Sequence, residues 1–81
     1  MIVKVKLFAI LRDRAPKKVP IGESFDIEVL EGCRIIDLLS TLKISEEEAK
    51  IVMVDHYIVR DYSVELEEGN EIAIFPPVGG G

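Results

Sequence analysis

Histidine and cysteine, which commonly perform catalysis or bind metals, are scarce in this chain. His56 is the only histidine and Cys33 the only cysteine among 81 residues. A histidine-containing catalytic triad and a multi-ligand zinc site therefore cannot be built from this chain alone. We expect Cys33 to be a small residue at a helix end and His56 to be a surface turn residue. One cysteine also permits no internal disulfide, which fits a reducing compartment and predicts a cytoplasmic protein.

Long apolar runs and phosphate-binding glycine loops are missing as well. No apolar run approaches the roughly 18 residues of a membrane span, so no membrane association is expected. Gly22, Gly32 and Gly69 are isolated, and no glycine-rich loop opens a helix as phosphate cradles require. The sequence predicts a chain that binds no cofactor and no metal. Any ATP used in its chemistry would be bound by a partner.

An excess of basic charge is also absent. The net charge is −5 and the pI is near 4.8, which argues against non-specific nucleic-acid binding. The charge is unevenly distributed along the chain. Residues 1–20 carry six basic residues against Asp13 alone, whereas residues 21–81 carry four basic and fourteen acidic residues. The acidic majority suits a basic protein partner.

What the sequence does contain is a series of short strand patterns. Alternating or continuous apolar residues predict five strands, at residues 2–11, 24–30, 51–54, 57–59 and 71–75. Prolines, charges and Gly22 predict a loop over residues 12–22. Asp55-His56 is expected to form a turn, and Gly69 or Asn70 to provide positive φ in a second tight turn.

Two helical segments are predicted between the second and third strands. The first covers residues 34–42, where an amphipathic stripe is formed by Ile35, Ile36, Leu38, Leu39 and Leu42. Its start lacks a good N-cap, because Cys33 and Arg34 stand where Ser, Thr or Asp is preferred. The second is a short helical turn at residues 45–48, where Ser45 and Glu48 have capping-box spacing.

This order of elements predicts an α+β fold in which helices cover one face of a mixed sheet. Strand alternation places Phe8 and Phe75 on the second face of the two terminal strands. We expect these two aromatic side chains to meet on the uncovered face.

The last residues form the narrowest segment of the sequence. Pro76 and Pro77 restrict the backbone and direct the chain away from the body in an extended form. Val78 follows, and then Gly79, Gly80 and Gly81, which lack side chains and could enter a narrow slot. We expect Gly81 to be the terminal residue and its backbone carboxylate to be the reactive group.

Three segments together resemble a known family. They are residues 5–12 (VKLFAILR), residues 36–39 (IDLL) and residues 69–81 (GNEIAIFPPVGGG). The chain resembles the MoaD/ThiS family of ubiquitin-like sulfur carriers, and among them the small subunit of molybdopterin synthase. The resemblance implies a β-grasp fold, with about five strands, one main helix and a short second helix. It also implies a domain over residues 1–78 and a flexible glycine tail over residues 79–81.

The resemblance implies a carrier mechanism centred on Gly81. A MoeB-like adenylyltransferase of the ubiquitin-activating type would use ATP to adenylate the Gly81 carboxylate. Sulfur from a persulfide donor would then displace AMP and leave a thiocarboxylate. The tail, residues 76–81, would enter a MoaE-like large subunit and donate sulfur for the dithiolene of molybdopterin. The chain would thus be a non-catalytic small subunit of a sulfurtransferase complex.

The family's partner surface is an apolar patch on the sheet near the tail. By resemblance it falls on Phe8 and Phe75, with Val59 as a weaker third member. Gly79 makes a triple glycine, which also occurs in ThiS-like carriers for thiazole synthesis. Two other functions therefore stay open: a ThiS-like carrier for thiamine synthesis, and a ubiquitin-like modifier conjugated to lysines through Gly81. A weaker alternative is a binding domain whose tail is inert.

Overall fold

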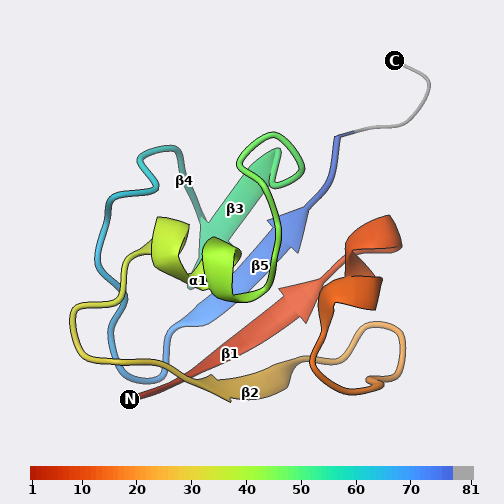
Figure 1. Ribbon diagram of the computed structural model, residues 1–81, viewed down its shortest axis with the longest axis horizontal. Helices are drawn as coiled ribbons and strands as arrows, with labels where there is room; N and C mark the ends of the chain where they lie inside the picture. Colours follow the sequence, from red (N-terminus) through yellow and green to blue (C-terminus); the bar gives the residue numbers. More distant parts are fainter. Residues whose placement is uncertain (78–81) are drawn as a thin grey trace.

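Parallel pairing of the first and last strands forms the centre of the structure (Figure 1). The computed structural model describes residues 1–77. Its five-stranded mixed sheet has the order β2-β1-β5-β3-β4, and only β1 and β5 run parallel to each other. The strands are β1 (Ile2–Leu7), β2 (Phe25–Glu28), β3 (Ile51–Val54), β4 (Tyr57–Val59) and β5 (Glu71–Phe75). The predicted α+β plan and all five strands are confirmed, with shorter bounds for β1 and β2.

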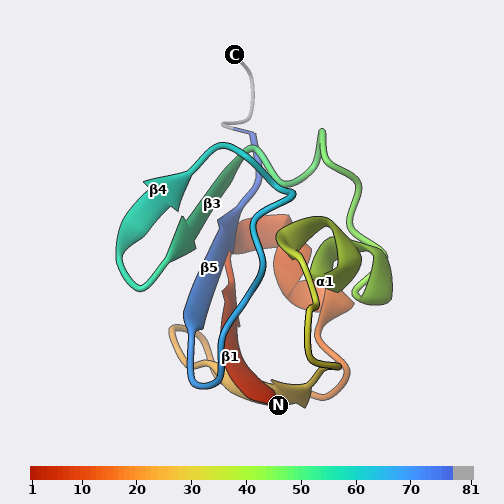
Figure 2. The ribbon, with the colours of Figure 1, turned by 90° about the vertical axis from the view of Figure 1, so that its left-hand side faces the viewer.

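A single layer of helix covers one face of this sheet. Figure 2 shows α1 (Ile35–Thr41) on one side of β1 and β5. Every second side chain of the central strands points toward α1. Together with the buried side chains of α1 they form a core that is almost entirely aliphatic. Fully buried members are Val3, Val5, Leu11, Ile35, Leu38, Leu39, Val52, Ile72 and Ile74. No helix formed by residues 1–77 covers the opposite face of the sheet, which is called the open face below.

The first strand is shorter than the alternation predicted. It ends at Leu7, and its last bond to β5 is donated by the Phe8 N–H to the Ile74 carbonyl at 3.3 Å. The partner strand is followed by Pro76, which has no N–H to continue a ladder. Continuation of β1 to residue 11 would leave backbone groups without a neighbouring strand, so this part of the prediction is wrong.

The chain instead turns into a 3-10 helix, η1 (Ala9–Arg14), inside the segment predicted as strand and loop. Ala9 adopts φ 53° at the reversal, a left-handed conformation that costs a non-glycine residue about 1 kcal/mol. The reversal returns Leu11 to the core, where it is fully buried. Burial of a leucine side chain contributes about 2 kcal/mol, which exceeds the cost of the turn.

The main helix is confirmed, and its start is better stabilised than the sequence suggested. Arg34 is the N-cap residue, and its side chain makes no capping bond. The Arg34 backbone N–H instead donates to the Asp37 carboxylate at 2.9 Å. Asp37 also places a negative charge in the first turn, where the helix dipole favours it. The side chain that caps the helix start is therefore that of Asp37, three residues after the N-cap residue.

The second predicted helix, residues 45–48, is a hydrogen-bonded turn. Both bonds of the predicted capping box are present: Glu48 N–H donates to Ser45 Oγ and Ser45 N–H donates to Glu48 Oε1, each at 3.0 Å. Ala49 N–H donates to the Ser45 carbonyl and is buried. Because β3 begins two residues later, only one turn fits. The short second helix of this fold is therefore η1.

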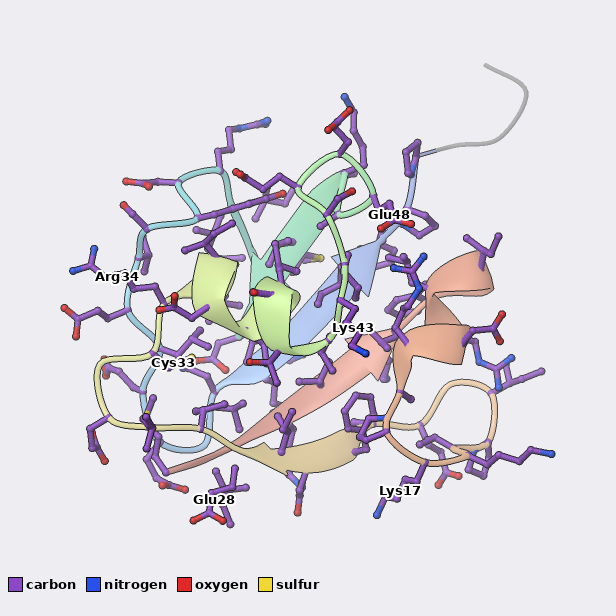
Figure 3. All side chains as sticks on the ribbon, in the orientation of Figure 1. Lys17, Glu28, Cys33, Arg34, Lys43 and Glu48 are labelled. Carbon is purple, nitrogen blue, oxygen red and sulfur yellow. The ribbon has the colours of Figure 1, made fainter. Side chains whose placement is uncertain are left out.

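Glu48 also joins this turn to η1 (Figure 3). Its two carboxylate oxygens accept bonds of 2.9 and 2.6 Å from the Arg14 guanidinium. Arg14 Nη1 donates as well to the Lys43 carbonyl. Hydrogen bonds from Arg14 and then from Ser45 lower the pKa of Glu48 from 4.5 to about 2, and the pKa of Arg14 is raised by its bond to Glu48. One ion pair thus connects segments 34 residues apart.

The predicted turns are confirmed. Asp55 and His56 have φ 50° and 74°, as a two-residue hairpin between β3 and β4 requires. Gly69 has φ 81° and precedes β5. Asp55 also accepts bonds from Asn70 Nδ2 and from the Glu71 N–H, at 2.7 and 2.8 Å. The two turns are therefore connected at one end of the sheet.

The described chain ends at the opposite end of the sheet. Because β1 and β5 are parallel, their carboxyl ends lie together, where η1 begins and the described chain reaches Pro77. The predicted boundary between residues 1–78 and residues 79–81 lies outside the described residues. Within residues 1–77, no helix has the length and apolar character needed to cross a membrane.

Replacement of Glu48 by glutamine should lower the free energy of unfolding at neutral pH. The folded-state pKa of Glu48 is depressed to about 2, so its stabilisation is present above its ordinary pKa and is lost as pH falls toward about 2. The difference between wild type and Glu48→Gln in urea unfolding should therefore shrink between about pH 5 and pH 2. Glu47→Gln removes the same charge from the same turn and serves as the control. An equal effect of both substitutions would contradict a specific role for Glu48.

Candidate functional site

Two stacked aromatic rings occupy the open face at the end where the described chain stops. The centroids of Phe8 and Phe75 are 4.2 Å apart and their planes differ by 13°. Each side chain is half-buried. Phe8 directly follows β1 and Phe75 ends β5, so the parallel pairing of these strands brings the rings together. The structure confirms that these residues meet on the open face.

Three further apolar side chains extend this surface across β3 and β4. Ile51 lies opposite Phe75, and Met53 lies between Ala73 and Ile58 in the strand register. Directly opposed residues share a face of the sheet, so all three belong to the open face. Ile51 and Ile58 are 41% and 54% exposed. We call Phe8, Ile51, Met53, Ile58 and Phe75 the apolar patch.

Sequence reasoning missed the three aliphatic members of the patch. The run 51–54 is apolar on both faces, so its period alone does not tell which residues point toward the helix. The turn at residues 55–56 gives a partial signal, because it fixes which residues pair but not which face of the sheet each pair occupies. A two-residue turn sets Met53 opposite Ile58 and Val54 opposite Tyr57.

Val59 is not part of the patch. It lies opposite Val52, which is fully buried beneath α1, so both side chains share the covered face. Val59 is partly buried and packs against the core. The structure therefore separates Val59 from the two phenylalanines, with which the resemblance had grouped it. The strand alternation places Ile58 on the open face instead.

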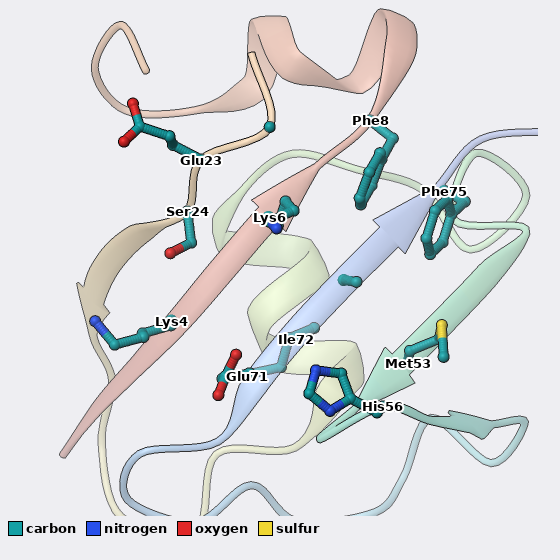
Figure 4. A pocket seen from close by; sticks show the side chains of 12 residues that line it. Lys4, Lys6, Phe8, Glu23, Ser24, Met53, His56, Glu71, Ile72 and Phe75 are labelled. Carbon is teal, nitrogen blue, oxygen red and sulfur yellow. The ribbon is translucent and has the colours of Figure 1, made fainter. Parts of the chain in front are cut away.

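A shallow groove of about 460 Å³ continues from the aromatic pair along the open face (Figure 4). Phe8, Phe75, Met53 and Ala73 line its apolar part. Its polar part is lined by Lys4, Lys6, Glu23, Glu71 and His56. His56 is exposed, as predicted, and lies at the groove margin because its hairpin closes that side. The groove is open and rests on strands, so it suits a protein surface better than an enclosed small molecule.

The predicted tail residues are only partly described. Pro76 is half-buried and Pro77 is exposed, directly after Phe75. Val78, Gly79, Gly80 and Gly81 lie outside the described residues. Phe75, a member of the apolar patch, is therefore adjacent in sequence to the tail. A partner covering the patch would lie beside Pro76 and Pro77.

The body offers little chemistry of its own. Burial, and secondarily the Asp37 carboxylate, raise the pKa of the Cys33 thiol, which disfavours the reactive thiolate. Burial likewise raises the pKa of Tyr62, whose hydroxyl donates to the Ala49 carbonyl at 2.6 Å. Within residues 1–77, no group of three His, Cys, Asp or Glu side chains is arranged to bind a metal ion.

The mixed sheet, its covering helix and the open apolar patch define the class of ubiquitin-like β-grasp proteins. The sequence profile of the ThiS family matches residues 5–81. The chain therefore belongs to the ThiS family, within the MoaD/ThiS group of small ubiquitin-like carriers. A search of curated proteins returns no match.

Solved structures agree with this assignment. The putative molybdopterin converting factor subunit 1 of Pyrococcus furiosus is 30% identical, with a TM-score of 0.68 over 95% of this chain and 98% of that one. A second similar structure is the complex of subunits 1 and 2 of the Helicobacter pylori molybdopterin-converting factor. One of its chains matches at 21% identity and a TM-score of 0.61, over 100% of this chain and 100% of that one. Small archaeal modifier protein 1 of Haloferax volcanii matches at 20% identity and TM-score 0.69, over 95% and 98% of the two chains. The last two similarities concern the fold.

Phe8 and Phe75 should be energetically coupled in the isolated protein. A stacked aromatic pair contributes about 0.5–1.5 kcal/mol beyond the area it buries. In a double-mutant cycle of Phe8→Ala and Phe75→Ala, the double substitution should therefore destabilise less than the sum of the single ones, by an amount in this range. Urea unfolding of the four proteins measures the coupling. Ile58→Ala with Phe8→Ala is a control pair on the same face, and additivity of the two phenylalanine substitutions would contradict the stacking.

Proposed function

We propose that this protein is a sulfur carrier that supplies sulfur for the dithiolene of molybdopterin, or of the related tungsten cofactor. The working group in this proposal is the backbone carboxylate of Gly81, converted to a thiocarboxylate. The observation that carries the proposal is the family match through residues 5–81, which includes the glycine tail. The apolar patch beside the start of that tail supports it.

The chemistry assigned to the tail requires activation. A carboxylate is a poor electrophile, so a MoeB-like adenylyltransferase joins the Gly81 carboxylate to AMP from ATP and releases pyrophosphate. The terminal sulfur of a persulfide donor then attacks the Gly81 carbonyl carbon. The bond between this carbon and the AMP oxygen breaks, and AMP leaves. Reductive cleavage of the resulting acyl disulfide by a thiol leaves the thiocarboxylate. Narrow, side-chain-free residues Gly79 and Gly80 let the tail enter the active site.

The division of labour follows from the body of the chain. The pKa of its cysteine is raised by partial burial and its histidine lies on an exposed turn, so we assign the acid–base groups to the activating enzyme and the sulfur acceptor complex. We assign docking to the apolar patch, whose aromatic members Phe8 and Phe75 lie at the end of the sheet where the described chain stops. Truncation of an aromatic residue that a partner fully buries commonly costs about 2 kcal/mol or more of binding free energy.

A MoaE-like large subunit is the proposed sulfur-accepting partner. The similarity to subunit 1 of the Pyrococcus furiosus molybdopterin converting factor reaches 30% over nearly the whole chain. The Helicobacter pylori relative with the same fold is a complex of subunits 1 and 2. These two similarities favour molybdopterin over thiazole as the destination of the sulfur.

Conjugation to other proteins is a second candidate function. The fold also matches small archaeal modifier protein 1 of Haloferax volcanii. A modifier would use the same adenylated Gly81, but the attacking nucleophile would be a lysine amine of a target protein. The two functions share activation and differ in the second step.

Incubation with ATP, a persulfide donor, a reducing thiol and the cognate activating enzyme should replace one oxygen of Gly81 by sulfur. Intact mass spectrometry should detect this exchange, and fragmentation should place it on the last residue. Deletion of Gly80 and Gly81 should abolish it without changing the unfolding midpoint, because the deleted residues follow the β-sheet. Omission of ATP is the matched control. A persistent lack of sulfur incorporation would overturn the carrier function.

The thiocarboxylated protein should then form the dithiolene when mixed with the cyclic pyranopterin precursor and a MoaE-like subunit. Dithiolene formation is measured by oxidising the product to a fluorescent derivative. Sulfur transfer to a thiazole-forming enzyme without dithiolene formation would assign the chain to thiamine synthesis. Isopeptide bonds from Gly81 to lysines of many proteins in cell extract would favour the modifier function instead.

A further inference from the structure

Two lysines on the open face of β1 have different electrostatic surroundings. Lys4 lies between Asp26 on β2 and Glu71 on β5 in the strand register. Its ammonium donates to the Asp26 carboxylate at 3.1 Å. The charge of Lys4 is therefore compensated within the chain.

Lys6 is two residues further along the same strand and the same face, nearer the aromatic pair (Figure 4). Its cross-strand neighbour on β5 is Ala73, whose side chain is short and uncharged. Within residues 1–77, the ion pairs are Lys4 with Asp26 and Arg14 with Glu48, and Lys6 takes part in neither. The carboxylates that line the same groove are Glu23, in the loop before β2, and Glu71, which is opposed to Lys4 rather than Lys6.

Lys6 is also already half-buried before any partner binds, whereas Lys4 is exposed. Its side chain lines the groove together with Phe8 (Figure 4). A partner that covers the apolar patch would remove part of the solvent around Lys6. Desolvation of a lysine without a compensating anion is strongly unfavourable, so such a partner would lose much of the affinity gained from the aromatic pair.

We propose that Lys6 determines the specificity of docking, by pairing with a carboxylate on the activating enzyme that adenylates the tail. This inference rests on the proposed function, because adenylation is what requires an activating enzyme to cover the open face. The occupant is an acidic side chain presented next to an apolar surface, so that the apolar part meets Phe8 and Phe75 while the carboxylate meets Lys6. Lys4 does not serve this role, because Asp26 already holds it.

The charge of Lys6 should affect binding and leave the chemical step unchanged. In ATP–pyrophosphate exchange with the cognate activating enzyme, Lys6→Met should raise the KM for the carrier by about tenfold or more, because the enzyme's carboxylate is left unpaired. The kcat should stay unchanged, since the lost interaction is present before and during the reaction. Lys6→Arg should preserve most of the affinity, and the salt dependence of KM should be weaker for Lys6→Met than for wild type.

Lys4→Met is the matched control, because it removes the same charge from the same strand and face. It should change KM by less than about threefold, as surface ion pairs contribute little. Lys6→Glu should weaken binding further, and a Glu→Lys or Asp→Lys substitution at the facing position of the enzyme should restore it. Urea unfolding of each variant checks that the body remains folded.

Equal effects of Lys6→Met and Lys4→Met on KM would overturn the role of Lys6 while leaving adenylation, and therefore the proposed function, intact. Tighter binding of Lys6→Met would also overturn it, since an apolar side chain would then suit the partner better than a cation. If the wild-type chain is not adenylated at all, the proposed function fails and this inference fails with it.

Discussion

Parallel pairing of β1 with β5 is the constraint on which the rest of the structure depends. It places Val5 beside Ile72 and Leu7 beside Ile74 in the strand register. All four are buried on the covered face. The same pairing brings the ends of both strands to one edge, where Phe8 and Phe75 stack on the other face. Two segments nearly the whole chain apart in sequence thus build both the centre of the core and the aromatic pair. Loss of this pairing would remove both.

The proposed function separates recognition from reaction. Recognition belongs to a rigid sheet face, whose apolar patch and lysines are positioned by strand register. Reaction belongs to the tail that follows Pro77. A body of this size has little room for a catalytic cleft, so a surface that docks and a terminus that reacts are an economical arrangement. Under our proposal, Lys4 and Lys6 differ in role, because Lys4 is paired with Asp26 whereas Lys6 takes part in no ion pair within residues 1–77.

Local patterns predicted most elements but misjudged where some of them end. The helix over residues 35–41 and the hairpin at residues 55–56 follow from periodicity and turn chemistry, which act over a few residues. The end of β1 does not, because it depends on Pro76, which follows the neighbouring strand β5 and is far along the chain. The capping box at residues 45–48 forms as its spacing indicates. The segment is nevertheless a single hydrogen-bonded turn, because β3 begins at Ile51.

The sequence by itself determined the α+β plan, the aromatic pair, the family and the glycine tail, because alternation, spacing and motifs are properties of the linear chain. Tertiary structure alone decided which apolar residues join the patch. Val59 lies on the covered face opposite Val52, and Ile51 lies on the open face opposite Phe75. It also decided that Lys4 meets Asp26 while Lys6 faces Ala73. The physical reason is strand register, which sets the neighbours of each side chain across the sheet and cannot be read from either strand alone.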